Sequence, residues 1–166
     1  MYNVNDVVVY ATSGICKITA IKKLDFTGKQ QEYYILKNLH SDKNVFYVPV
    51  NNKAALSKLH TVCTRAEADE LISHMNSERV LWIDNDVKRK EEYSRIIRDA
   101  DKHEIIRLIK TLYLRRKELS EMGRKLRSSD ENYLSIAENM LFEEFAYALE
   151  IDRSDVVDYI HEHIAS

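Results

Sequence analysis

Three groups of basic residues stand between positions 88 and 127 of the sequence. Lysine and arginine donate charge-assisted hydrogen bonds to phosphate, so such groups favour an anionic partner, with DNA or RNA as the first candidates. Taken singly, each group could equally be a solvated helix face with an acidic partner one turn away, as Lys88 has in Glu92. The groups are Lys88, Arg89 and Lys90; Arg115, Arg116 and Lys117; and Arg124, Lys125 and Arg127.

The charge of the chain is distributed unevenly, although its net value is only −2. Residues 88–127 carry fourteen Lys and Arg against seven Asp and Glu, a net charge of +7. Residues 1–63 have a net charge of +4, whereas residues 64–87 have −4 and residues 128–166 have −9. Phosphate binding depends on local positive density and not on the total, so the basic centre supports an anionic partner.

Trp82 is the only tryptophan, and it lies six positions before Lys88. One interpretation is a core residue that anchors the junction before a helix. The other is an exposed apolar wedge beside a basic helix, which can enter a widened minor groove or the gap between unstacked bases. The residues alone leave both interpretations open.

The sequence gives little support for catalysis or for a metal site. It has no glycine-rich phosphate loop, no nucleophile elbow, no HExxH and no CxxC pair. His161 and His163 form an HxH, but side chains two positions apart on a helix diverge and make a poor metal site. We therefore expect no enzymatic activity, no cofactor and no bound metal.

The first part of the chain has the pattern of short strands. Apolar β-branched runs alternate with turn residues such as Gly14 and Gly28. Pro49 cannot donate to a strand ladder, so its strand is expected at a sheet edge, or to end there. The expected strands are residues 7–10, 15–23, 32–39 and 45–50, with turns at 11–14, 25–29 and 41–44.

From about residue 63 the pattern becomes helical. Thr64 and Glu67 have the spacing of a capping box, and later apolar residues such as Ile105, Leu108 and Leu112 recur on one helix face. Five helices are expected: about 64–75, about 84–98, one opening at 101, one opening at 128, and about 154–164. The predicted fold class is α+β, with a small Tudor-like or SH3-like barrel over 1–62 and a helical bundle over 63–166.

No apolar run approaches the roughly 18 residues that a membrane span requires. The first residues also lack the basic and apolar regions of a secretory signal. We therefore expect a cytoplasmic protein that makes no membrane contact.

The order of several motifs resembles the CarD/CdnL family of bacterial transcription regulators. In the first half these motifs are Val4, Asp6–Tyr10, Gly14, Ile21, Gly28, Tyr33-Tyr34-x-Leu36 and Val48-Pro49. In the second half they are Trp82, Arg89, the helix start at Asp101, Leu112–Lys117 and the helix start at Ser128–Glu131. The family shares its N-terminal module with the transcription-repair coupling factor, which continues into a helicase that is not found here.

The resemblance implies a Tudor-like domain that binds the β-subunit lobe of bacterial RNA polymerase by sheet augmentation. It also implies a helical domain that contacts the upstream edge of the melted promoter, with Trp82 wedged into the minor groove. The expected DNA-binding residues are Trp82, Lys88, Arg89, Lys90, Arg115, Arg116, Arg124 and Lys125. The expected polymerase-binding residues are Leu24, Val45, Phe46, Tyr47 and Val48.

The sequence also departs from the family pattern. Leu24 and Tyr47 stand where some members carry basic residues, which favours an apolar, backbone-paired polymerase contact. Asn5 and Ala11 replace a common Gly and a common Pro. The stretch from Trp82 to the helix start at 101 is about one turn longer than in some members, so the alignment of 88–90 is open. Without the resemblance, strand 45–48 could be a barrel edge with no partner.

Together these features predict a non-enzymatic regulator that binds polymerase as a monomer and stabilises open promoter complexes. Its DNA contacts are expected to be independent of sequence. Two alternatives stay open from the residues alone. The helical bundle could bind another protein through its acidic C-terminal half, or the chain could bind RNA, because charge does not distinguish nucleic acids.

Overall fold

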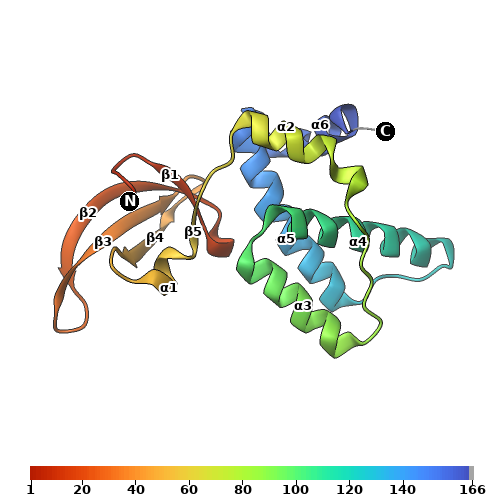
Figure 1. Cartoon of the computed structure of the whole chain (residues 1–166), viewed down its shortest axis with the longest axis horizontal. Coiled ribbons are helices and arrows are strands. Elements are labelled where there is room, and N and C mark those ends of the chain that lie inside the picture. The colour runs from red at the N-terminus through yellow and green to blue at the C-terminus, as the bar shows by residue number, and fades with distance from the viewer. Residues whose placement is uncertain (165–166) are drawn as a thin grey trace. The chain divides into compact units, whose positions relative to one another are not determined.

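The computed structural model describes residues 1–164 and divides the chain into two compact units, one of residues Met1–Val62 and one beginning at Cys63 (Figure 1). The first contains all the strands and the second contains the long helices. Each unit has its own cluster of buried apolar side chains, so each is described separately.

The N-terminal unit is a five-stranded antiparallel sheet with the order β4-β3-β2-β1-β5. This order makes β4 and β5 its two edge strands. The predicted Tudor-like β domain is therefore confirmed, as is the edge position of the strand that ends at Pro49. The elements are β1 (Val7–Tyr10), η1 (Ala11–Ser13), β2 (Ile15–Asp25), β3 (Gln30–Asn38), β4 (Ser41–Pro49), α1 (Lys53–Leu56) and β5 (Leu59–Thr61).

The β2–β3 hairpin forms where the turn signals predicted it. Gly28 has a φ of 79°, which glycine adopts without the steric cost of a Cβ. Its N–H donates to the Asp25 carboxylate at 2.7 Å, and this bond closes the loop. Asp25 pairs with Gln30, so the hairpin fixes the register of β2 and β3.

The expected turn at residues 41–44 is wrong. Leu39 and His40 form the turn, and Ser41 already pairs with Asn38. Residues 42–44 instead lie in a bulge of β4, because the next pair joins Lys37 to Val45. Polar residues that favour turns also suit a bulge, where they have no partner in the ladder.

The core of the N-terminal unit lies on one face of the sheet. Residues on alternate positions of β3 and β4 point into it, as the two-residue period of a strand requires. The buried cluster consists of Val8, Cys16, Ile18, Tyr34, Leu36, Val48 and Leu59. The opposite face therefore carries Tyr33, Ile35 and Tyr47.

The second unit is helical, as predicted, and two of its helices, α2 and α4, begin at the predicted caps. Thr64 and Glu67 form the capping box, with bonds of 3.2 and 2.8 Å. Asp101 caps its helix through the Glu104 N–H at 3.0 Å. The elements are α2 (Arg65–Ser73), η2 (Met75–Ser77), α3 (Asp86–Asp99), α4 (Lys102–Glu121), α5 (Ser128–Leu149), η3 (Arg153–Asp155) and α6 (Val156–His163).

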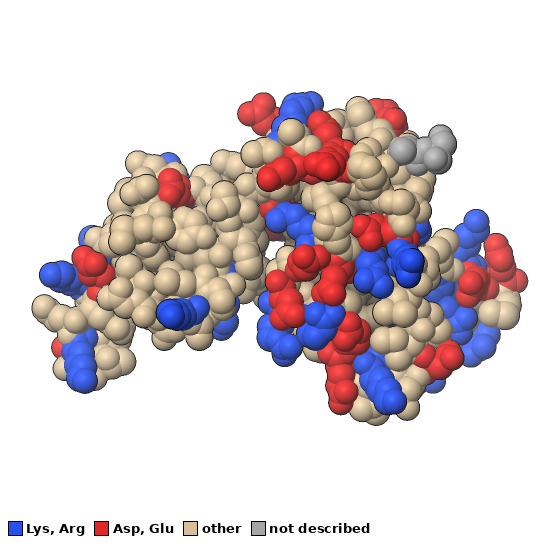
Figure 2. Space-filling view, viewed as in Figure 1, with Lys and Arg blue, Asp and Glu red and all other residues tan. Residues whose placement is uncertain are grey.

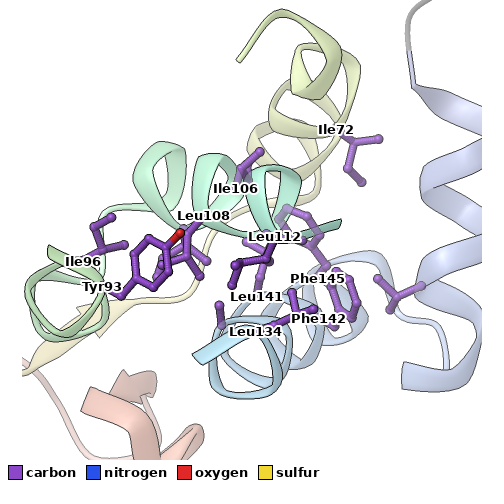
Figure 3. Close-up of a cluster of buried hydrophobic side chains, with 14 of the residues drawn as sticks. Ile72, Tyr93, Ile96, Ile106, Leu108, Leu112, Leu134, Leu141, Phe142 and Phe145 are labelled. Carbon is purple, nitrogen blue, oxygen red and sulfur yellow. The ribbon is translucent and has the colours of Figure 1, made fainter. Parts of the chain in front are cut away.

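The core of the helical unit is built mainly between α4 and α5, with α3 and α2 packed against them (Figure 3). Ile105, Leu108 and Leu112 are buried, as the spacing on α4 predicted. Phe142 and Phe145 of α5 fill the centre, and burial of such large side chains supplies most of the favourable free energy. Within residues 1–164, no helix is both long enough and apolar enough to span a bilayer.

Candidate functional sites

Trp82 lies half-buried in the segment that precedes α3, partly packed against the helical core. Its indole N–H donates to the Asp84 carboxylate at 2.9 Å. The guanidinium carbons of Arg89 and Arg115 lie over the ring, 4.5 and 4.8 Å from its centroid. Trp82 is therefore neither sealed in the core nor freely mobile: cation–π contacts hold a ring that keeps part of its surface in solvent.

Arg89 is buried, with a relative exposure of 1%. Two bonds of 3.0 Å join its guanidinium to the carboxylate of Asp130, which is equally buried, and a third of 2.7 Å joins it to Asp86. Its remaining N–H groups donate to the backbone carbonyls of Ile83 and Asp84, at 3.0 and 3.4 Å. All five donors are thus occupied within the protein.

The position of Arg89 therefore gives no support to its predicted DNA contact, because none of its donors is free. A phosphate would have to displace a buried, bidentate carboxylate, and breaking such a pair costs far more than one phosphate contact returns. Arg89 instead joins α3 to the first turn of α5 and holds the backbone just after Trp82. Its hydrogen bond also lowers the pKa of Asp86, which keeps that carboxylate charged.

The other predicted basic residues are exposed or half-buried. Arg115 pairs with Glu118 at 3.1 Å and Arg116 with Glu131 at 3.6 Å, both at positions that solvent reaches. Such surface pairs contribute little and exchange easily for another anion. Among the described residues, no carboxylate forms an ion pair with Lys88, Lys90, Arg124 or Lys125, all of which are exposed.

One cation–π contact and two ion pairs bring Arg115, Arg116 and Arg127 close to the neighbouring elements of the helical unit. Arg115 of α4 lies over Trp82, and Arg116 of the same helix pairs with α5. Arg127, at the end of the α4–α5 loop, pairs with Asp86 at the start of α3. On the face seen in Figure 2, acidic and basic side chains are intermixed over this unit. Exposed Val80, Leu81 and Val87 flank Trp82 in the sequence.

A separate apolar groove of about 250 Å³ lies between α4, α5 and α6. Ile106, Leu141, Phe142 and Ile160 are among its lining residues. None of the predicted DNA-binding residues lines it. The sequence pattern predicted no groove between these helices.

The outer edge of β4 is unpaired along part of its backbone. The Val50 N–H donates to the Glu32 carbonyl at 2.9 Å. Because hydrogen-bonding direction alternates along an antiparallel strand, the backbone groups of Val48 and Phe46 then point toward β3. Val48 is also buried at 1% exposure, so its side chain faces the core and its position does not support its predicted contact with polymerase.

The same alternation directs the backbone groups of Val45 and Tyr47 away from β3. Pro49 takes the next outward position, where its missing N–H disturbs no ladder bond. Between the bulge and Pro49, β4 therefore presents two residues whose N–H and C=O groups can pair with an added strand.

An aromatic cluster lies beside this edge, on the face of the sheet that is turned away from the core. The ring of Phe26 lies 5.1 Å from that of Tyr33 and 5.3 Å from that of Tyr47. Phe26 and Tyr47 are 59% and 48% exposed, whereas Tyr33 is buried beneath them. Half-buried Leu24 is on the same face, because it pairs with Gln31, two positions before Tyr33.

The N-terminal unit matches a known protein family. Residues 2–60 match the family described as the CarD-like/TRCF RID domain. The N-terminal unit is similar to a RID domain. The predicted resemblance to CarD-like proteins is thereby confirmed over these residues. No curated protein matches the chain.

The RID match covers β4 and the aromatic cluster, and it ends before the helical unit. Within this unit, the predicted residues Val45 and Tyr47 lie on the free edge strand, and Phe46 is half-buried against Tyr10. Leu24 lies on β2, separated from that edge by β3, but on the same face of the sheet as Tyr47. Sequence reasoning missed Phe26, because it was assigned to a hairpin loop. Its signal was an aromatic residue in a turn, a position where polar residues are usual.

Proposed function

We propose that this chain is a non-enzymatic transcription regulator that binds the β subunit of bacterial RNA polymerase and contacts promoter DNA. The RID domain adds its β4 edge to a strand of the β-subunit lobe. The helical unit then lies near the DNA and stabilises the open complex without reading base sequence. The observation that carries the proposal is the RID match combined with an unpaired β4 edge.

The polymerase contact is supported by the chemistry of the edge. Backbone pairing supplies affinity, and flanking side chains supply specificity in strand addition. Here the flanking side chains are Phe26 and Tyr47, both exposed and aromatic, as is typical of residues that dominate binding energies. The contact is therefore apolar and backbone-paired, in keeping with the absence of basic residues at positions 24 and 47.

The DNA contact is supported by Trp82 and by the unpaired basic side chains. Lys88 and Lys90 hold phosphates, which fixes position but carries no sequence information. Trp82 favours unstacked DNA, and a ligand that prefers one state shifts the equilibrium toward it. Attachment to polymerase raises the local concentration of the helical unit at the promoter, so each contact can be weak. The function needs no bond chemistry.

Tyr47→Pro is expected to weaken binding to RNA polymerase about tenfold relative to Tyr47→Ala, because only the proline removes an outward N–H. Binding is measured by co-purification and titration with polymerase. Circular dichroism checks that both variants remain folded, since proline is tolerated where no ladder bond is lost. Equal affinity of the two variants would exclude strand addition at this edge. Failure of the wild-type chain to bind polymerase would exclude the proposed function.

A further inference from the structure

We propose that two arginines act differently on Trp82: Arg89 is a fixed support, and Arg115 is a displaceable cover that exchanges the indole for a phosphate. Both guanidiniums lie over the same ring, at 4.5 and 4.8 Å. The proposal rests on the proposed function, because it concerns how the same tryptophan becomes available to DNA. Arg89 and Arg115 are positioning residues for it.

Arg89 is fixed by its surroundings. Each of its five N–H groups has an acceptor, and its bidentate partner Asp130 is as buried as Arg89 itself. Movement would leave a buried carboxylate unpaired, a state that proteins avoid strongly. One side of the indole therefore rests on a support that DNA does not displace.

Arg115 is held much less completely. Its side chain is 32% exposed, and its ion pair is with Glu118, which is itself 62% exposed. Within the described part of the chain, the Nε–H of Arg115 is buried and has no acceptor. A buried donor without a partner is costly, so the position of Arg115 over the ring is a compromise.

A phosphate group relieves that compromise. Its oxygens accept two parallel N–H bonds from a guanidinium, which would satisfy Nε and one Nη together. The Glu118 pair is lost, but surface pairs of this kind contribute little. Departure of Arg115 uncovers the indole at the moment when a phosphate is bound, so exposure of the wedge is coupled to the presence of a nucleic-acid backbone.

Fluorescence tests this directly, because Trp82 is the only tryptophan in the chain. In the free full-length protein, Arg115→Ala is expected to raise acrylamide quenching of Trp82 about twofold, because one of the two guanidiniums over the ring is removed. Arg116→Ala is the matched control: it removes the same charge from the adjacent position, but its guanidinium lies over Tyr113. Equal quenching in the two variants would overturn the role of Arg115 as a cover.

Inorganic tripolyphosphate tests the exchange. It is expected to raise quenching in the wild type toward the Arg115→Ala value and to leave Arg115→Ala unchanged. No rise in the wild type would overturn the exchange. These measurements use no DNA and no polymerase. Failure of the proposed function would instead appear as absent binding to forked promoter DNA in variants whose quenching still differs as expected.

Discussion

Trp82→Ala is expected to shorten the lifetime of promoter open complexes about five- to thirtyfold. The estimate follows if the wedge favours separated strands by about 1–2 kcal/mol, because that range corresponds to these ratios. The ring is half-buried in the free protein and remains supported by Arg89, so the effect is that of a single aromatic contact. The measurement is the decay of competitor-resistant complexes on one defined promoter, with polymerase saturated by the variant.

Val157→Ala is the matched control for the tryptophan variant. Val157 is also an apolar residue of the helical unit, 41% exposed, but it lines the separate groove between α4, α5 and α6. It is expected to leave the lifetime unchanged. An unchanged lifetime in Trp82→Ala, with its helical content intact, would contradict a role for Trp82 in stabilising the separated strands.

Arg89→Leu is expected to lower the free energy of unfolding by about 3–5 kcal/mol, because it leaves the buried Asp130 carboxylate without its partner. Urea unfolding followed by circular dichroism measures this loss. Arg89→Lys is expected to recover little of it, because an ammonium cannot form the two parallel bonds that hold Asp130.

Arg95→Leu is the control for Arg89→Leu, because it removes an equally charged and paired side chain that is not buried. Arg95 pairs with Glu92, Asp99 and Glu104, but its side chain is 36% exposed, so its loss is expected to lower the free energy of unfolding much less than the loss of Arg89 does. The double variant Arg89→Leu, Asp130→Leu is expected to regain most of the stability, because no buried charge then remains unpaired. A similar loss in Arg89→Leu and Arg95→Leu would contradict the assignment of Arg89 as the fixed support of Trp82.

The regular elements were predictable because their signals are local. Thr64 and Asp101 mark helix starts through side chains that bond to N–H groups three residues on. Pro49 indicated an edge strand because a proline there loses no ladder bond. The short elements were not predicted: α1 and β5 are four and three residues long, too short for the periodicity of their apolar residues to be recognised.

The candidate sites were predictable in composition but not in detail. The run Lys88-Arg89-Lys90 shows three cations, yet nothing local indicates that the middle one pairs with a carboxylate 41 residues later. Helical geometry directs neighbouring side chains to different faces, so one of the three enters the core while two face solvent. Alternation along a strand has the same effect at Val48: its side chain is buried, whereas that of its neighbour Tyr47 points to the other face of the sheet.

The partial exposure of Trp82 also depends on distant residues. Its cover comes from Arg115 and its support from Arg89, which lie on different helices. The sequence suggested either a core anchor or an exposed wedge. The structure combines features of both, because an amphipathic ring can be packed on one side and remain accessible on another.

The most direct test of the central claim uses photo-crosslinking side chains at positions 47 and 88 of the full-length protein in one polymerase–promoter complex. We expect position 47 to crosslink to the polymerase β subunit and position 88 to crosslink to promoter DNA beside the melted region. Crosslinks from position 88 to protein alone, or to RNA in preference to DNA, would contradict it.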